Sequence, residues 1–224
     1  RGDWELDTIR TGNIDSVTLN LPRAHYDAEE DKSKFFENVY DLSEMALRAL
    51  EMKYLTIRQR AKEGLLPFLL RGEKRDPYSR LENATRLLSF VGLNETVQSI
   101  TGKAIYESKD ALNLAEKIMT HLSKVIKEHV KRYDARFALS MTPDLGAARR
   151  LAELDIEKYG LGKVRIQSAG DEPSYTNMMV VPPGADIPLD DRLNLEGRFH
   201  KMAPGSHLVL IPLRDSDVET EDLL

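Results

Sequence analysis

The sequence contains no cysteine among its 224 residues. This absence excludes disulfides, zinc sites built from thiolates and thiol nucleophiles within these residues. Long apolar runs are also missing, since no window approaches the roughly 20 apolar residues that a bilayer-spanning helix needs. The N-terminus does not resemble a signal peptide. We therefore expect a protein of the cytoplasm that makes no contact with a membrane.

Several motifs of nucleotide and hydrolytic chemistry are absent too. The glycines form neither a Rossmann fingerprint nor a P-loop, and no serine lies in a G-x-S-x-G elbow. The five histidines show no metal-ligand spacing, so we predict no metal site and expect ordinary surface or half-buried histidines. The net charge of −5 and the dispersed acidic residues argue against general attraction to nucleic acid.

The composition is that of a globular protein, with 41% hydrophobic and 31% charged residues. We expect a single domain over residues 1–224, ending in an acidic tail over residues 215–224. The first residue is Arg1 and not methionine, so we expect the chain to be a segment of something longer.

Hydrophobic periodicity predicts strands that alternate with helices. Such alternation is typical of an α/β fold with a parallel sheet. The predicted strands cover residues 16–22, 85–93, 136–142, 175–184 and 206–213. The predicted helices cover residues 33–64, 95–100 with Asn94 as the N-cap, 108–131 and 142–159, and more weakly 189–202.

The first predicted strand has a regular polar face. In SVTLNLPR, Val17 and Leu19 alternate with Thr18 and Asn20 until Pro22 stops the pattern. A buried amide without partners costs about 1–3 kcal/mol, so Asn20 should bond either to water at a sheet edge or to a polar group in an enclosed space. The pattern alone leaves both interpretations open.

The turn SMTPDLGAA carries a helix-start signal after a predicted strand. Thr142 can serve as the N-cap, and Pro143 fits the first helical position. The small residues Gly146 and Ala147 would let a phosphate approach the free backbone N–H groups. The negative charge of Asp144 opposes an anion there, and a well-capped helix without any ligand is the alternative.

Taken in order, several stretches resemble the anaerobic (class III) ribonucleoside-triphosphate reductases. They are GNIDSVTLNLPR, FVGLNE, a long helix, SMTPDLGAARRLA, SYTN and FHKMAPGSH, and the match runs from about Gly12 to Leu213. The resemblance implies the α/β barrel of glycyl radical enzymes, which has ten strands in two parallel five-stranded halves. This chain resembles the second, C-terminal half.

The resemblance also implies roles for particular residues. Asn20 matches the family's active-site asparagine, which is placed to hydrogen-bond the ribose or the reductant formate, and the polar strand face would line the barrel lumen. The turn that begins at Thr142 matches the turn that receives the substrate's phosphates. The implied substrate-binding residues are Thr18, Thr142, Pro143, Leu145, Gly146, Ala147, Thr176 and Asn177.

The sequence departs from the family's pattern in its radical chemistry. The family uses a cysteine thiyl radical, a glycyl radical near the C-terminus and often a four-cysteine zinc site, and none of these is present. In the family a Gly-Cys-Arg tip precedes the matching strand by roughly the distance from Arg1 to Asn20, so the resemblance implies that the radical cysteine belongs immediately before Arg1. Ser140 stands where the family frequently has an aromatic residue. The resemblance thus implies no cofactor in this segment, with the glycyl radical and zinc in parts outside it.

The partners implied are a ribonucleoside triphosphate, the rest of the reductase, a radical SAM activating enzyme and a second copy of the full-length protein. By itself the chain should be inactive. One alternative is a noncatalytic homologue or split subunit that acts as a nucleotide-binding or assembly module. Another is a different glycyl radical enzyme, acting on pyruvate or a diol.

Overall fold

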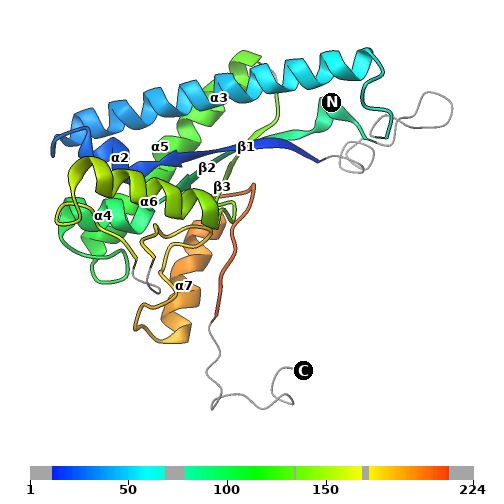
Figure 1. Ribbon diagram of the computed structural model, residues 1–224. Helices are drawn as coiled ribbons and strands as arrows, with labels where there is room; N and C mark the ends of the chain where they lie inside the picture. The colour runs from blue at the N-terminus through cyan, green and yellow to red at the C-terminus, as the bar shows by residue number, and fades with distance from the viewer. Residues whose placement is uncertain (1–11, 69–78, 134, 168–171, 212–224) are drawn as a thin grey trace, which may run out of the picture.

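Figure 1 shows the computed structural model, which describes residues 12–68, 79–133, 135–167 and 172–211. The predicted acidic tail, residues 215–224, lies outside the described residues, as do the last two residues of the strand predicted over 206–213.

Three parallel strands form the sheet, in the spatial order β1–β2–β3. Their bounds are β1 Asn13–Asn20, β2 Thr85–Val91 and β3 Phe137–Ser140. Thr18 pairs with Ser89, which in turn pairs with Ser140, so three hydroxyl-bearing residues form one row across the sheet. The predicted α/β class with a parallel sheet is confirmed.

Helices connect and cover these strands. They are α2 Leu21–Tyr26, α3 Lys32–Lys62, α4 Leu93–Thr101, α5 Lys109–Tyr133, α6 Leu145–Tyr159 and α7 Leu189–His200, with a 3₁₀ turn over Leu81–Asn83. In the part of the chain that the structure describes, none of the helices has the length and apolar character needed to cross a bilayer.

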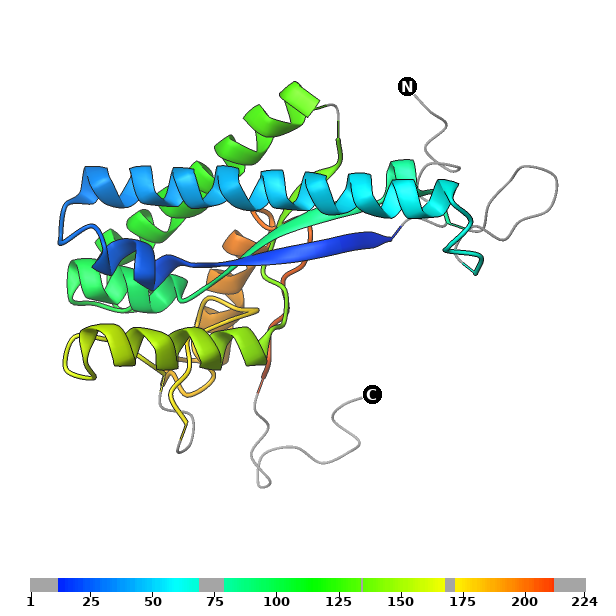
Figure 2. The same ribbon diagram turned by 45° about the horizontal axis from the view of Figure 1, so that its top comes forward.

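One face of the sheet is apolar and lies beneath α3 and α5 (Figure 2). Leu19, Leu88 and Leu139 occupy neighbouring positions on that face and are at most 5% exposed. Helices cover parallel sheets in this way because each strand must bury its apolar side chains. Burying a leucine of this kind contributes about 1.5–3 kcal/mol to folding.

The opposite face carries small and polar side chains. The row of Thr18, Ser89 and Ser140 lies on it, and α6 packs there against Val91 at the carboxyl end of β2. Ala148 and Ala152 of α6 belong to the same buried cluster as Val91, and their small side chains let the helix approach closely. Thr18 on β1 is therefore matched by Ser89 on β2 and by Ser140 on β3, while Leu87 and Val91 of β2 also lie on this face.

The predicted strand over residues 16–22 is wrong at its end, because β1 stops at Asn20 and α2 begins at Leu21. The polar stretch that follows was not expected to be helical. Pro22 lies in the first turn of α2, where a missing N–H is not a loss, and the side chain of Asn20 caps the helix. Proline here begins a helix directly after the strand.

The predicted N-cap of the next short helix is also wrong. Gly92, in the left-handed conformation with φ +75°, takes the cap position of α4, and Asn94 lies inside the helix. Oδ1 of Asn94 instead accepts from the backbone N–H of Ile105 at 3.0 Å. The side chain therefore holds the loop after α4.

The two C-terminal predicted strands are wrong in the described residues: the one over residues 175–184 forms no strand or bridge, and the one over residues 206–213 keeps a single bridge. The apolar stretch over residues 175–184 is buried without being a strand, because the backbone N–H groups of Val180 and Val181 donate to the carboxylate of Glu196. The segment after α7 makes one parallel bridge, Ser140 to Ser206, beside β3. His207, whose side chain is 1% exposed, contacts Glu196 at 2.8 Å, so it is not a surface histidine.

Candidate active site

Functional sites of parallel α/β sheets lie at the carboxyl ends of the strands. Here the residues that meet at those ends, named below the carboxyl-edge site, come from β1, α4, the β3–α6 turn, α6 and the loop before residue 178. They are Asn20, Glu95, Asp144, Asp155, Tyr175, Thr176 and Asn177.

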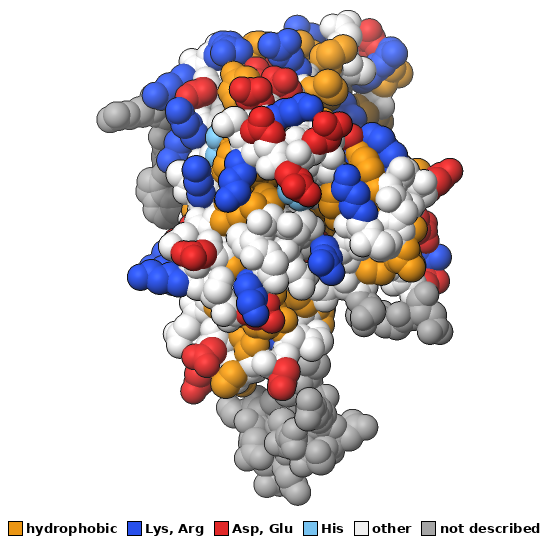
Figure 3. Space-filling view, turned by 90° about the vertical axis from the view of Figure 1, so that its left-hand side faces the viewer, with side chains coloured by type: hydrophobic (Ala, Val, Ile, Leu, Met, Phe, Trp, Pro, Cys, Tyr) orange, Lys and Arg blue, Asp and Glu red, His pale blue; other side chains and the backbone are white. Residues whose placement is uncertain are grey.

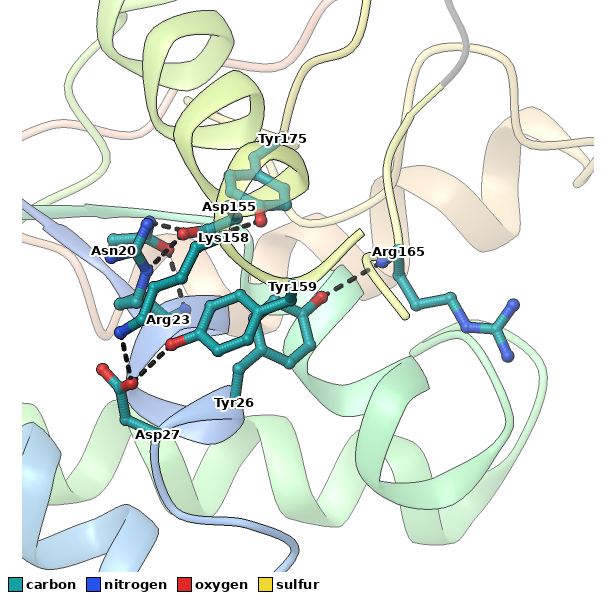
Figure 4. A network of polar contacts seen from close by, with 9 residues as sticks. All are labelled: Asn20, Arg23, Tyr26, Asp27, Asp155, Lys158, Tyr159, Arg165 and Tyr175. Carbon is teal, nitrogen blue, oxygen red and sulfur yellow. Dashed lines mark hydrogen bonds and ion pairs between the residues drawn. The ribbon is translucent and has the colours of Figure 1, made fainter. Parts of the chain in front are cut away.

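Asn20 is the last residue of β1 and is half-buried. Its Oδ1 accepts from the backbone N–H of Arg23 at 3.0 Å, and its Nδ2 donates to Oδ2 of Asp155 at 2.9 Å (Figure 4). Both bonds are to protein groups, one on α2 and the other on α6. The side chain therefore lies in an enclosed polar contact, which is one of the two environments that the strand pattern allowed.

Asp155 is fully buried and receives hydrogen bonds from three separate segments. Besides Asn20, the hydroxyl of Tyr175 donates to it at 2.6 Å, and Nε of Arg23 pairs with its other oxygen. Burial alone would lower the pKa of Arg23, but the hydrogen bond and charge of Asp155 outweigh it and raise that pKa. Burial, together with the hydrogen bond to Asp155, raises the pKa of Tyr175 well above its ordinary value.

Asp155 is not among the predicted site residues, although the sequence carries a signal for it. Ala148, Ala152 and Asp155 follow one another at spacings of four and three, and all three are buried on one stripe of α6. A carboxylate within a buried helical stripe needs hydrogen-bond donors from elsewhere in the fold. The stripe therefore indicates a buried polar contact without identifying its partner.

Glu95 lies in the first turn of α4 and is 0% exposed. Its Oε1 accepts from the hydroxyl of Thr176 at 2.5 Å and from the backbone N–H of Thr176 at 3.2 Å. Its Oε2 is buried and has no hydrogen-bond partner among the residues that the structure describes. Burial raises the pKa of this carboxyl above its ordinary value.

The loop that contains Thr176 and Asn177 crosses the carboxyl ends of β2 and β3. The carbonyl of Thr176 accepts from the N–H of Gly92 at 2.8 Å, and Oδ1 of Asn177 accepts from the N–H of Asp144 at 3.3 Å. Met178 follows with φ 60°, a left-handed conformation that is costly for a residue with a side chain. Thr176 and Asn177, both predicted as site residues, thus lie beside the β3–α6 turn.

The predicted start of α6 is wrong by two residues. Asp144, and not Thr142, is the N-cap, and its Oδ1 accepts from the N–H of Ala147 at 2.9 Å. The helix begins at Leu145, so Pro143 lies outside it. Aspartate competes well for this position because its carboxylate accepts from the free N–H groups and also interacts with the helix dipole.

The structure also places the other predicted residues of this turn, Thr142, Leu145 and Gly146. The hydroxyl of Thr142 contacts that of Ser140 at 2.7 Å, and its N–H donates to Oγ of Ser89 at 3.1 Å. Leu145 is 71% exposed, and Gly146 is exposed beside it. The turn is therefore joined to the polar row of the sheet, and its outer residues are open to solvent.

The structure brings most of the predicted residues to one edge of the sheet, but not into one set of direct contacts. Thr18 lies one row below Asn20 on the polar face, and its side chain makes no hydrogen bond to the other site residues that the structure describes. Asn20 is linked to Thr176 indirectly. Asn20 and Tyr175 both donate hydrogen bonds to Asp155, and Tyr175 is the residue before Thr176 in the sequence. Within the described ranges, no group of three or more histidine, aspartate or glutamate side chains could hold a metal ion.

The surface on the side of α2 and α4 is of mixed charge (Figure 3). Basic and acidic side chains are interspersed over this face, with apolar side chains between them. Near Asn20, Lys158 pairs with Asp27 at 2.8 Å, and Tyr159 also donates to Asp27. These contacts join the end of α6 to α2.

Comparison with known proteins gives a consistent result. The family model for anaerobic ribonucleoside-triphosphate reductase matches residues 2–223. Proteins of that name from Haemophilus influenzae and Enterobacteria phage T4 are each 24% identical to this chain, over 88% and 91% of its length. The chain spans only 28% and 33% of those two relatives.

The fold is similar to that of a solved structure. The crystal structure of the anaerobic ribonucleotide reductase from Thermotoga maritima with glycerol in the active site matches with a TM-score of 0.80 and 20% identity. The match covers 95% of this chain and 34% of that one.

Proposed function

The chain belongs to the anaerobic ribonucleoside-triphosphate reductase family, and we propose that it forms half of the catalytic barrel of such an enzyme and holds the nucleotide substrate at its carboxyl-edge site. The observation that carries this proposal is the polar face of the sheet. Parallel sheets usually bury apolar side chains on both faces, whereas here Thr18, Ser89 and Ser140 line one face below Asn20.

In this proposal Asn20 is the catalytic residue of the segment and hydrogen-bonds the ribose or a small carboxylate reductant. Its amide has two N–H donors and an oxygen with two lone pairs. The bonds to Asp155 and Arg23 use one donor and one lone pair. One N–H and one lone pair therefore remain for a substrate, and a fixed amide lowers the entropic part of the barrier.

The turn over residues 142–147 would receive the phosphates. The first helical N–H groups, those of Leu145 and Gly146, have no intrahelical acceptor and lie at the positive end of the α6 dipole. The capping carboxylate of Asp144 opposes an anion, but it is turned toward the N–H of Ala147. Thr142, Thr176 and Asn177 would border the same space.

The radical chemistry would come from segments outside these residues. The chain has no cysteine, so a thiyl radical that abstracts a ribose hydrogen must be supplied from elsewhere, with the glycyl radical and any zinc site. A radical SAM enzyme would generate the glycyl radical, and the working enzyme would be a homodimer. What this chain contributes is binding and orientation.

The proposal is tested in the full-length enzyme by Asn20→Ser, since serine can still cap α2 but has no amide N–H. We expect kcat for ribonucleotide reduction to fall by about a hundredfold or more, as when a preorganised donor is removed. The matched control is Asn13→Ser, because Asn13 is an exposed asparagine at the opposite end of the same strand. Equal activities of the two variants would contradict the proposal.

A second candidate function is a noncatalytic homologue or split subunit that binds nucleotide or serves in assembly. The absence of cysteine from the 224 residues favours it, since the chain alone cannot carry a thiyl radical. The chain alone should then bind a ribonucleoside triphosphate without reducing it. Reduction that requires a cysteine-bearing partner segment supports the enzyme, and reduction by the isolated chain contradicts both functions.

A further inference from the structure

Asn20 is held by two contacts that together determine which way its amide faces. Oδ1 meets the N–H of Arg23 at 3.0 Å, and Nδ2 meets a carboxylate oxygen of Asp155 at 2.9 Å. If the amide flipped, its NH₂ would face the N–H of Arg23, and its oxygen would face the carboxylate. Both contacts would become repulsive, so the orientation of the amide is defined by its surroundings.

Three hydrogen-bond donors hold the carboxylate of Asp155 in place. It is 0% exposed and accepts from Asn20, from the hydroxyl of Tyr175 and from Nε of Arg23 (Figure 4). These partners lie on three segments, so the carboxylate cannot turn without breaking bonds to the others.

We infer that Asp155 is a positioning residue that orients the Asn20 amide, so that the N–H donors of Nδ2, and not the carbonyl oxygen, lie on the side of the amide that faces Asp155. This inference rests on the proposed function, because it assigns Asp155 a role through Asn20. It predicts that the group offered to the substrate on that side is a hydrogen-bond donor. Such a donor suits an oxygen of the ribose or of a carboxylate reductant.

A purely structural role for Asp155 is the competing explanation, since the same carboxylate also joins α6 to α2. The structure offers a control for that role. Tyr159 lies four residues further along α6 and donates to Asp27, the C-cap of α2, and Figure 4 shows no hydrogen bond between Tyr159 and Asn20. Tyr159→Phe therefore removes a link between the same two helices and leaves the amide of Asn20 in place.

The test is a double-mutant cycle on kcat in the full-length enzyme, with Asp155→Ala and Asn20→Ser. We expect Asp155→Ala to lower kcat about tenfold to a hundredfold with little change in KM, as a small misplacement of a reacting group does. The double variant should be no slower than Asn20→Ser alone, because no amide is left to orient. Tyr159→Phe should leave kcat unchanged.

The conservative variant Asp155→Asn gives a rescue. Its side-chain oxygen can accept from Nδ2 of Asn20 and from Tyr175, while its NH₂ faces Arg23, whose side chain is 28% exposed and can turn toward solvent. We expect it to recover most of the kcat that Asp155→Ala loses. Where the alanine variant does not fold, Asp155→Leu takes its place in the cycle, because leucine fills the volume and favours the helix.

The outcomes separate this inference from the proposed function. If Asn20→Ser leaves kcat unchanged, the proposed role of Asn20 fails and the inference fails with it. If Asn20→Ser lowers kcat but the losses of the two variants multiply in the double variant, Asp155 acts independently of Asn20, and only the inference is overturned. The same holds if Asp155→Asn is as slow as Asp155→Ala.

Discussion

Gly92 and Pro22 pack so closely that a Cβ atom on Gly92 would lie 2.4 Å from Cγ of Pro22. Gly92 directly follows β2 and caps α4, and Pro22 lies in the first turn of α2. The two residues therefore bring together the segments that follow β1 and β2. This close approach places Asn20 and Glu95 at the same edge of the sheet.

The first prediction concerns this contact. Gly92→Ala introduces both a left-handed alanine and a steric clash, whereas Gly102→Ala introduces only the left-handed alanine, because nothing lies within 4 Å of its Cβ at the same φ of +75°. We expect Gly102→Ala to lower the free energy of unfolding by about 1–2 kcal/mol. Gly92→Ala should cost about 1–3 kcal/mol more. Denaturant titration of both variants measures the difference. Equal losses in the free energy of unfolding would show that Pro22 moves aside without destabilising the fold.

The second prediction concerns the buried Glu95. Because burial raises its pKa in the folded state, the folded protein binds a proton more tightly than the unfolded chain. Its contribution to stability is therefore full below the ordinary pKa of 4.5 and is lost as the pH rises through the raised pKa. Glu95→Gln keeps an oxygen for Thr176 and removes the titration.

The free energy of unfolding is to be measured for the wild type, Glu95→Gln and Glu82→Gln between pH 4 and pH 8. We expect Glu95→Gln to gain stability over the wild type as the pH rises, while Glu82→Gln, at an exposed position, stays parallel to the wild type. A Glu95→Gln curve that also stays parallel to the wild type would mean that folding does not raise the pKa of this carboxyl.

The third prediction concerns the cap of α6. Asp144→Ala removes the acceptor for the N–H of Ala147 and should lower the free energy of unfolding by about 1 kcal/mol. Asp144→Asn retains a capping oxygen and should cost much less. Thermal unfolding distinguishes the two variants, and equal losses would show that charge, and not the hydrogen bond, stabilises this helix start.

The same pair of variants tests the phosphate-binding turn. If phosphates bind at residues 142–147, the charge of Asp144 weakens them, so Asp144→Asn should tighten the binding of a ribonucleoside triphosphate. The expected gain is about twofold to fivefold, which corresponds to ~0.3–1 kcal/mol for a charge at a helix N-terminus. Calorimetric titration measures it at low salt. Unchanged affinity would place the phosphates elsewhere.

The fourth prediction concerns Arg192, which is 4% exposed and donates to the carbonyl oxygens of four residues in the segment 181–185. Arg192→Met leaves these carbonyls without their donor and should lower the free energy of unfolding by about 2–4 kcal/mol. Arg198 on the same helix pairs with Glu116 but is 55% exposed. Its replacement by methionine should cost less than about 1 kcal/mol, and denaturant titration checks both.

The sheet and its long helices could be predicted because their signals are local. The apolar residues of α3 and α5 recur with the helical period, and the apolar runs of β2 and β3 are short and bounded. These elements were predicted to within a few residues. The local hydrophobic pattern is sufficient to predict an element when one stripe of its side chains faces the core.

Sequence reasoning failed where a distant group competes for the backbone. The run that contains Val180 and Val181 has the composition of a strand, but Glu196 accepts from its N–H groups in place of a neighbouring strand. Pro22 was interpreted as the stop of a strand, although it lies in the first turn of a helix capped by Asn20. In each case the deciding partner is a side chain and not the local pattern.

The candidate site was predictable only in part for the same reason. The polar face of β1 and the turn after β3 could be recognised from the sequence, and so could Asn20. Asp155, which lies 135 residues from Asn20 in the chain, could not be assigned to it without the fold. A helical stripe shows that such a carboxylate is buried, but only the packing of α6 against the end of β1 shows what it binds.

The most direct test of the central claim is an anaerobic crystal structure of the full-length protein with a ribonucleoside triphosphate bound. The account predicts that the ribose lies within hydrogen-bond distance of the Asn20 side chain and that the phosphates contact the backbone N–H groups of Leu145 and Gly146. A nucleotide bound elsewhere, with Asn20 touching only Arg23 and Asp155, would contradict it.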